Sequence, residues 1–221
     1  MRKILLIFFS ILFITGAAQT SNKKKVLVIP FSRFEFVSEF PLEEIAEKNE
    51  TTTDKVFLIY QKAILNAFDD YTDENFDFVQ VENAAIAPYK KFIQYKYDKF
   101  KRKQYYATDL KEFKEEDFTK MLEYYGADFV VFLNWYDIQK ESFTRGGRHE
   151  KRAPYAGHYI DYDVYNLFKQ KIIGKGRVKA EAYVPDDLQV SYELLRVKEL
   201  ESAYSNLAKQ IVDQLNNPME Q

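Results

Sequence analysis

The side chains that most often carry nucleophilic catalysis are scarce in this chain. The sequence has no cysteine and only two histidines, His149 and His158. Cys/His catalysis is therefore excluded, and a Ser/His/Asp triad would have to use one of the two histidines. His149 lies among charged residues, where water is poorly excluded. On a strand, His158 would point away from Asp161 and Asp163 because adjacent residues alternate between faces. We predict that both histidines are solvent-exposed polar residues, with no catalytic residue and no metal site.

Carboxylates are the remaining candidates for acid–base chemistry. A glycosidase needs two of them facing one bond, and nothing in their spacing indicates such a pair. If carboxylates gather at the carboxyl ends of the first and third strands, Glu35, Glu39 and Asp128 would serve a carbohydrate-active or other hydrolase. Asp128 also fits a structural role at a helix-to-strand junction. The pair Gly174 and Gly176 lacks the third glycine of a dinucleotide site, so it predicts either a bulge or a close approach of backbones within a strand, and we expect no cofactor.

A segment near residues 88–106 combines basic and aromatic side chains. Its apolar residues, from Tyr89 to Phe100, fall at helical spacing, which predicts a Lys/Tyr-rich helical insertion. Its basic residues could bind an anionic glycan or a membrane surface. These residues are Lys90, Lys91, Lys96, Lys99, Lys101 and Arg102. The alternative is a solvent-exposed helix whose aromatic side chains enter the core and whose lysines pair with the acidic segment 109–125.

A second basic stretch lies in a polar region that predicts a hairpin tip. Its candidate partner-binding residues are Arg145, Arg148 and Arg152. The whole chain is nevertheless weakly acidic, with a formal net charge of −2, so we do not expect nucleic acid as a partner. The chain is also rich in aromatic residues, with 17 Tyr and 19 Phe, and half-buried strands are the commoner place for such side chains.

The remaining pattern predicts the elements that position these residues. Residues 127–136 form the most concentrated apolar run without alternation, which predicts a central strand buried on both faces. Gly126 is placed to end the preceding helix. Strands are predicted at 26–31, 76–81, 127–136, 156–168 and 172–184, and helices at 54–70, 109–125 and 200–215.

The order of these elements predicts an α/β fold. It reads β-α-β-α-β-β-β-α, because the helical insertion adds no strand. Helical crossovers make the first three strands parallel, and short connections add an antiparallel meander. We therefore expect a mixed sheet of about five strands with helices packed on it.

The start of the chain predicts export. Basic residues 2–3 precede an apolar run at 4–14 and the small residues Gly16-Ala17-Ala18, which is typical of a secretory signal peptide. The run is shorter than the roughly 20 residues of a spanning helix, although an uncleaved anchor is the alternative. Cleavage after residue 18 would leave 19–221 as one α/β domain in the periplasm or outside the cell. A cysteine-free exported chain favours a bacterial envelope over a eukaryotic secretory pathway.

Three pieces of the chain resemble a group of bacterial envelope proteins. They are Lys25–Phe31, Gly126–Val131 and the meander holding Ile173–Gly176. These match the "V-x-V-x-P-F" first strand, the "L-G-A-D-[YF]-[VI]-[VI]" third strand and the following meander of the TolB amino-terminal domain and the curli-secretion lipoprotein family (CsgG-like). The resemblance extends over most of residues 19–221. The absent lipid-anchor cysteine, the basic segment 88–106 and the Arg-Gly-Gly-Arg loop depart from it.

That resemblance implies how such a protein works. Domains of these families act in envelope assembly or secretion through protein–protein contacts, without catalysis. We therefore expect a non-enzymatic envelope protein with an unknown protein partner. The hydrolase and the polyanion or membrane-surface binder stay as alternatives.

Overall fold

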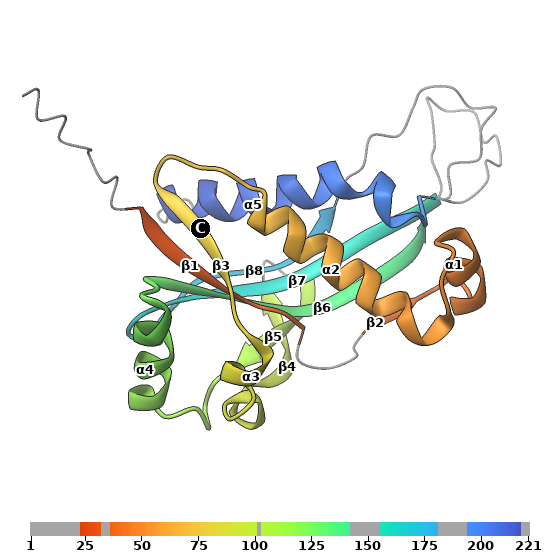
Figure 1. Cartoon of the computed structure of the whole chain (residues 1–221). Helices are drawn as coiled ribbons and strands as arrows, with labels where there is room; N and C mark the ends of the chain where they lie inside the picture. Colours follow the sequence, from red (N-terminus) through yellow and green to blue (C-terminus); the bar gives the residue numbers. More distant parts are fainter. Residues whose placement is uncertain (1–22, 32–35, 101–102, 142–154, 181–193, 218–221) are drawn as a thin grey trace, which may run out of the picture.

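The structure is a computed structural model and describes residues 23–31, 36–100, 103–141, 155–180 and 194–217. Within these ranges the main sheet has six strands, in the order β3-β1-β6-β7-β8, with β2 also paired to β6 (Figure 1). They are β1 (Lys24–Ile29), β2 (Phe36–Ser38), β3 (Phe76–Gln80), β6 (Phe129–Glu141), β7 (Tyr155–Asn166) and β8 (Lys171–Ala180). β3, β1 and β6 are parallel, and β7 and β8 continue antiparallel. This confirms the predicted mixed α/β sheet; β2 was not predicted.

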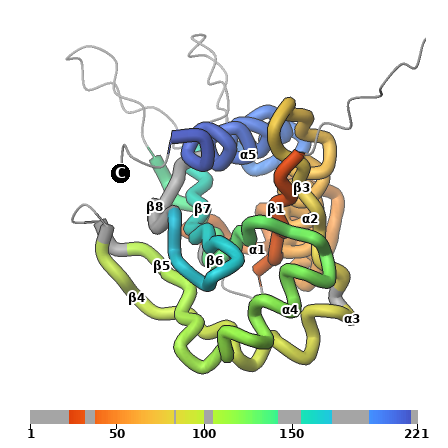
Figure 2. Tube along the Cα trace, turned by 90° about the vertical axis from the view of Figure 1, so that its left-hand side faces the viewer, coloured from red at the N-terminus to blue at the C-terminus, as the bar shows by residue number. Residues whose placement is uncertain are grey.

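Helices cover both faces of the sheet. α2 and α5 lie side by side on one face, and α4 lies on the opposite face (Figures 1 and 2). The α-helices of the described part are α1 (Leu42–Lys48), α2 (Val56–Asp69), α3 (Asn83–Ile86), α4 (Glu115–Tyr125) and α5 (Glu201–Asn216). Short 3₁₀ turns occur at η1 (Thr53–Lys55), η2 (Lys90–Phe92) and η3 (Val197–Glu199). The buried residues of α2 and α5 recur at helical spacing, as the sequence predicted.

β6 is the central strand and is buried on both faces. Val131 enters the helix-side core, the cluster packed with α2 and α5. Val130 enters a second cluster with α4 on the other face. At the start of β6, Gly126 ends α4 with φ +60°, a conformation that glycine adopts without strain. Asp128 accepts a hydrogen bond from the Lys25 backbone N–H at 2.9 Å and fastens β6 to β1, which confirms its structural role.

The predicted helical insertion near 88–106 is wrong. After η2, the chain forms two antiparallel strands, β4 (Gln94–Phe100) and β5 (Lys103–Asp109), which make a separate two-stranded sheet. The stretch from Tyr95 to Asp98 alternates aromatic and charged residues, and alternation with frequent tyrosine favours a strand. The acidic helix is also shorter than predicted, because residue 109 belongs to β5 and α4 begins at Glu115.

A β-bulge in β6 changes which side chains face the hairpin β4–β5. Leu133 is opposite Tyr162 and Trp135 is opposite Asp161, so Asn134 is the extra residue. Both Leu133 and Tyr136 enter the helix-side core although they are three residues apart. The bulge therefore leaves Asn134 and Trp135 together on the opposite face, the one that the hairpin covers.

A second irregularity lies between β7 and β8. Tyr162 is opposite Gly176 and Val164 is opposite Ile173, so β8 has an extra residue in this stretch. This confirms the bulge that Gly174 and Gly176 predicted.

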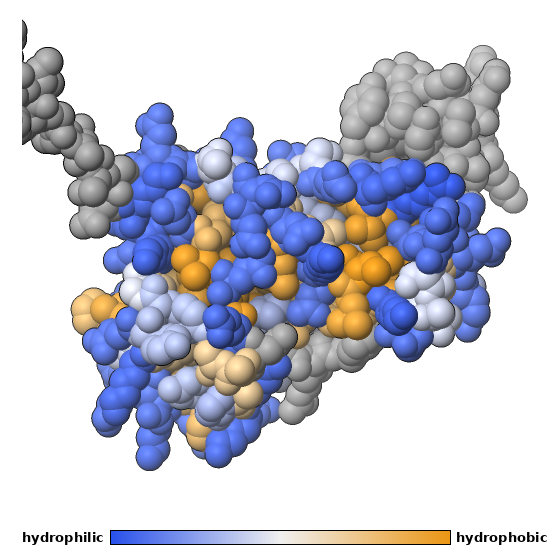
Figure 3. All heavy atoms as spheres, viewed as in Figure 1, coloured by the Kyte–Doolittle hydropathy of each residue, from blue (hydrophilic) through white to orange (hydrophobic). Residues whose placement is uncertain are grey.

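The surface seen from the direction of Figure 1 is mixed in character. Figure 3 shows hydrophilic side chains over most of this view, with smaller apolar areas between them, as is ordinary for a folded domain. Every helix in the described ranges falls short of the length and apolarity needed to cross a membrane.

Candidate functional site

The predicted basic residues do not form one face. Lys90 and Lys91 lie in η2 and are exposed. Lys96 and Lys99 are exposed on β4, three residues apart, and therefore point to opposite faces of the hairpin. Five further candidates lie outside the described residues: Lys101, Arg102, Arg145, Arg148 and Arg152. The described lysines of this segment therefore lie in η2 and on both faces of the hairpin rather than along one helix.

The hairpin β4–β5 is fastened to the main sheet by carboxylates of β7. In the part of the chain that the structure describes, no strand pairs with the edge of β5 that faces away from β4. The Tyr106 N–H donates to Asp161 Oδ2 at 2.9 Å. The Thr108 N–H donates to Asp163 Oδ2 at 2.6 Å. Two carboxylate side chains therefore take the place of strand carbonyls along this edge.

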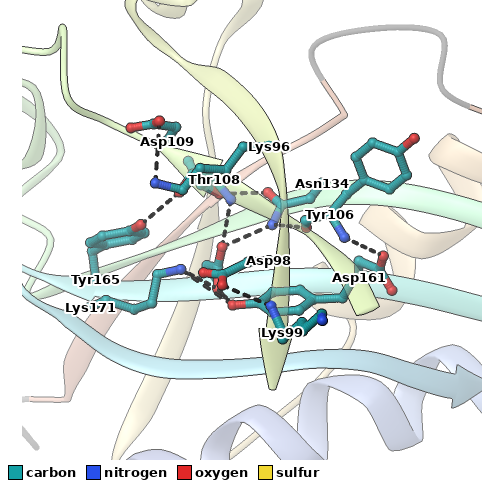
Figure 4. A network of polar contacts seen from close by, with 12 residues as sticks. Lys96, Asp98, Lys99, Tyr106, Thr108, Asp109, Asn134, Asp161, Tyr165 and Lys171 are labelled. Atoms are coloured by element: carbon teal, nitrogen blue, oxygen red, sulfur yellow. Dashed lines mark hydrogen bonds and ion pairs between the residues drawn. The ribbon is translucent and has the colours of Figure 1, made fainter. Parts of the chain in front are cut away.

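The carbonyl groups of the same two residues are also bound by side chains of the sheet. Asn134 Nδ2 donates to the Tyr106 carbonyl oxygen at 2.9 Å, and the Tyr165 hydroxyl donates to the Thr108 carbonyl oxygen at 3.1 Å. Figure 4 shows these contacts between the hairpin and the strands beneath it. The edge is thus fully bonded at Tyr106 and Thr108, which closes it to pairing with another chain there.

Asp163 is the centre of this network and is 0% exposed. Besides Thr108, its carboxylate accepts hydrogen bonds from Asn134 Nδ2 at 3.1 Å and the Tyr105 hydroxyl at 3.4 Å, and it forms an ion pair with Lys171 Nζ at 3.0 Å. Burial raises the pKa of Asp163, and Lys171 and the Thr108 N–H act in the opposite direction. A buried carboxylate with this many partners is a structural anchor.

Three aromatic rings pack in a row between the hairpin and β6, and we call them the aromatic ladder: Tyr97, Tyr106 and Trp135. The Trp135 and Tyr106 rings stack with centroids 3.8 Å apart at 11°. Tyr97 lies opposite Tyr106 across the hairpin, with centroids 3.9 Å apart, and the Tyr106 hydroxyl donates a hydrogen bond to the Tyr97 hydroxyl. Tyr97 is 64% exposed. The aromatic ladder is therefore a partly exposed aromatic surface that packs on Trp135 of the central strand β6.

The carboxylates proposed for a hydrolase either accept hydrogen bonds from backbone N–H groups or lie outside the described residues. Asp128 is bound to the β1 backbone. Glu39 accepts a hydrogen bond from the Lys140 backbone N–H. Glu35 belongs to the part that the structure does not describe. Among the described residues, no group of three or more His, Asp or Glu is arranged to hold a metal ion.

The prediction of an exposed His158 is wrong: it is 1% exposed. Its Nε2 lies 2.7 Å from the Leu194 carbonyl oxygen, which can only accept, so Nε2 carries the proton. Nδ1 then accepts a hydrogen bond from the Tyr136 hydroxyl at 2.7 Å, and that hydroxyl accepts one from Tyr204 at 2.7 Å. Burial lowers the pKa of His158 to about 4. This network is neutral and structural. His149 lies outside the described residues.

The sequence reading missed the residues that hold the hairpin. Asp161 and Asp163 were placed correctly on the face opposite His158, but their burial was not foreseen. One feature of the sequence could have indicated this burial. Asp161 and Asp163 lie on the strand next to the central one, and such a strand is expected to be covered on both faces. The bulge that turns Asn134 and Trp135 to the same face has no comparable signal in the sequence.

Comparisons with known proteins add little to this geometry. No protein-family model and no curated protein matches the chain. Among solved structures, a Helicobacter pylori protein named as a homolog of neuraminyllactose-binding hemagglutinin is similar, with 11% identity, coverage of 89% of this chain and 87% of that chain, and a TM-score of 0.35. So low a TM-score carries no argument about fold or function.

Proposed function

We propose that this protein is an exported, non-enzymatic protein of a bacterial cell envelope that acts in assembly or secretion through protein–protein contacts. The aromatic ladder on the hairpin β4–β5 is the contact surface. One observation carries this proposal: an exposed Tyr97 packs against Tyr106 with the rings tilted by 42°, and Tyr106 stacks on Trp135 of the central strand.

The chemistry of the ladder suits a protein partner. Tyrosine and tryptophan are enriched in protein interfaces and in the few residues that dominate their affinity. Binding also costs less free energy when the contact residues are already ordered. Here Tyr106 is fixed through its backbone by Asp161 and Asn134. A partner therefore meets a rigid aromatic surface rather than a hairpin that must first be ordered.

The sequence supports the envelope location. Residues 1–18 have the pattern of a signal peptide, and the resemblance to the TolB amino-terminal domain and the CsgG-like family suggests an envelope role. We expect the exported protein to begin at Gln19 in the periplasm or outside the cell. Amino-terminal sequencing of the protein from the envelope fraction checks this; an intact leader on all of the protein would contradict it.

Site-specific photo-crosslinking tests the contact surface. We replace Tyr97 with p-benzoylphenylalanine in the living cell and compare it with the same replacement at Tyr124, which is 78% exposed on α4. We expect one dominant envelope-protein adduct at Tyr97 and none at Tyr124. A Trp135→Leu change, which removes the ring under Tyr106, should weaken that adduct at least about tenfold.

Two outcomes would contradict the proposal. One is an equal pattern of adducts at both positions, which would indicate random encounters. The other is a Tyr97 adduct that Trp135→Leu leaves unchanged while circular dichroism shows that the variant remains folded. In either case the ladder is not the contact surface.

The polyanion binder is the second candidate function. Its supporting observation is the exposure of Lys90, Lys91 and Lys99. Salt-dependent binding to heparin or anionic liposomes, lost when these three lysines are changed to Glu, would favour it. Unchanged binding would remove it.

A further inference from the structure

A pocket lies on the side of the hairpin that faces away from the aromatic ladder. Lys96 and Asp98 line it, and they alternate along β4 with Tyr97. The pocket has a volume of about 390 Å³ and is open to solvent. This volume lies within the roughly 300–1,000 Å³ range of small-ligand sites. Its charged lining residues are Lys96, Asp98, Asp109, Lys111, Lys169 and Lys171.

The lining has an excess of positive charge, with four ammonium groups against two carboxylates. Lys96 Nζ is 3.3 Å from Asp109 Oδ2, yet its side chain is 54% exposed. Lys169 Nζ donates to the Phe113 carbonyl oxygen. Because an ammonium group has three donors, these lysines keep N–H groups for a ligand.

The inner wall of the pocket is rigid. Lys171 forms its ion pair with the fully buried Asp163 at 3.0 Å, and its ammonium group lies 5.6 Å from the centroid of the Tyr165 ring. Tyr165, which also lines the pocket, is hydrogen-bonded to the Thr108 carbonyl oxygen. Figure 4 shows Lys96, Lys171 and Tyr165 on this side of the network. The site is therefore formed before a ligand arrives.

We propose that this pocket binds a small phosphate ester that also carries hydroxyl groups, such as a sugar phosphate. Several lysines suit a multiply charged phosphate, which they bind as point charges. Among the described residues that line the pocket, no arginine fork is present for bidentate binding of a planar carboxylate. Asp98 and Asp109 supply carboxylate oxygens that accept hydrogen bonds from hydroxyls. The volume exceeds the needs of a bare ion and matches a phosphate joined to a sugar-sized group.

This inference does not rest on the proposed function. The pocket and the aromatic ladder lie on different faces of the hairpin, and the crosslinking result at Tyr97 does not depend on a ligand in the pocket. Each proposal can therefore fail without the other.

Isothermal titration of the purified protein with glucose 6-phosphate tests the site. We expect saturable binding, weaker binding of inorganic phosphate and no binding of glucose. The variant Lys96→Gln/Lys111→Gln should weaken binding at least about tenfold. The matched control Lys62→Gln/Lys209→Gln removes the same charge from exposed lysines of α2 and α5 outside the pocket lining and should bind as the unchanged protein does.

Further arms separate the possible sources of the phosphate. Vesicles of phosphatidylglycerol test whether the phosphate belongs to a lipid headgroup. We expect glucose 6-phosphate to bind in the absence of vesicles, which shows that no lipid is needed. In the unchanged protein, glucose 6-phosphate should shift the amide resonances of Thr108 and Lys111 in NMR spectra, a readout that needs no variant. No saturable binding at millimolar concentration would overturn the proposal. Equal weakening in both double variants would do the same, because it would indicate general attraction to a basic surface.

Discussion

The two faces of β7 hold polar networks of opposite character. The helix-side face holds His158, hydrogen-bonded to Tyr136 and through it to Tyr204, and every group there is neutral. The hairpin-side face holds Asp163, which is paired with Lys171. Both networks are buried, and both come from one strand whose side chains alternate between the faces.

This difference corresponds to different tasks. The neutral network joins the sheet to α5 and to the Leu194 carbonyl, so it links parts of one core. The charged network binds the backbone of the hairpin along an edge with which no strand of the described ranges pairs. Charged acceptors form stronger hydrogen bonds to backbone N–H groups than neutral ones do. A carboxylate can therefore hold an added element where a hydroxyl would hold it less firmly.

The two networks also respond to acid in opposite directions. Burial lowers the pKa of His158 to about 4, so the unfolded chain binds this proton first, and stability is lost as the pH falls from about 6.5 to 4. Burial raises the pKa of Asp163, so the folded protein takes up that proton first. The contribution of Asp163 to stability therefore increases as the pH falls through its raised pKa.

The largest effect is expected from Asp163→Ala. This change leaves the Lys171 charge and the Thr108 N–H without their shared partner, and breaking a buried pair costs about 3–5 kcal/mol. The free energy of unfolding from urea titration measures it. Asp77→Ala is the control: it breaks an exposed pair with Lys23 and should cost at most about 1 kcal/mol. Equal costs would show that Asp163 is no anchor.

The pH response of His158 is the next largest effect. The advantage of the unchanged protein over His158→Gln in free energy of unfolding should shrink by about 3 kcal/mol between pH 7 and pH 4. The variant provides the reference because Gln does not titrate. Urea titrations of both proteins across this range measure the difference. A constant difference would mean that His158 titrates alike in the folded and unfolded states.

Single hydroxyl removals test the neutral network at a smaller scale. Tyr136→Phe takes the donor from His158 Nδ1 and the acceptor from Tyr204, and should cost about 2 kcal/mol. Tyr204→Phe leaves the bond from Tyr136 to His158 in place and should cost about 1 kcal/mol. Thermal and urea unfolding give both values. The reverse order would place the centre of the network at Tyr204.

Tyr97→Ala should have the smallest effect on stability. The side chain is 64% exposed, and substitutions at exposed positions usually change the free energy of unfolding by about 0.5 kcal/mol or less. Partner binding should nevertheless fall. This result would distinguish Tyr97, which contacts the partner, from Asp163, which stabilises the fold. A large loss of stability would assign Tyr97 to the core instead.

The main sheet could be predicted because its pattern is carried by buried apolar residues. The run leading to Val131 reads as a strand buried on both faces, and Gly126 marks the end of the helix before it. The alternation along β7 also placed His158 and Asp163 on opposite faces correctly. The positions of the strands next to β6 follow from the rules for connections between strands, and these rules do not depend on individual side chains.

The hairpin could not be predicted in the same way. Tyr89, Phe92 and Ile93 fit a helical stripe, but they belong to η2 and the entry to β4. The second strand of the hairpin, β5, is fixed by hydrogen bonds between its backbone and distant side chains, such as the bond that its Thr108 N–H donates to Asp163, rather than by its own apolar pattern. Tertiary contacts of this kind override local propensity. The burial of His158 could not be predicted for a similar reason: its hydrogen-bond partners Tyr136 and Leu194 come from distant parts of the sequence.

Hydrogen exchange at the Tyr106 and Thr108 amides tests the central claim, that side chains of the sheet hold the hairpin edge. These amides face away from β4, so in an undocked hairpin they would exchange freely. We predict exchange at both amides at least about a hundredfold slower than for an unprotected amide. In Asp163→Ala the Thr108 amide loses its acceptor and should lose this protection, while the amide of Val131 in β6 stays protected. Rapid exchange at both amides in the unchanged protein, with Val131 protected, would contradict the account.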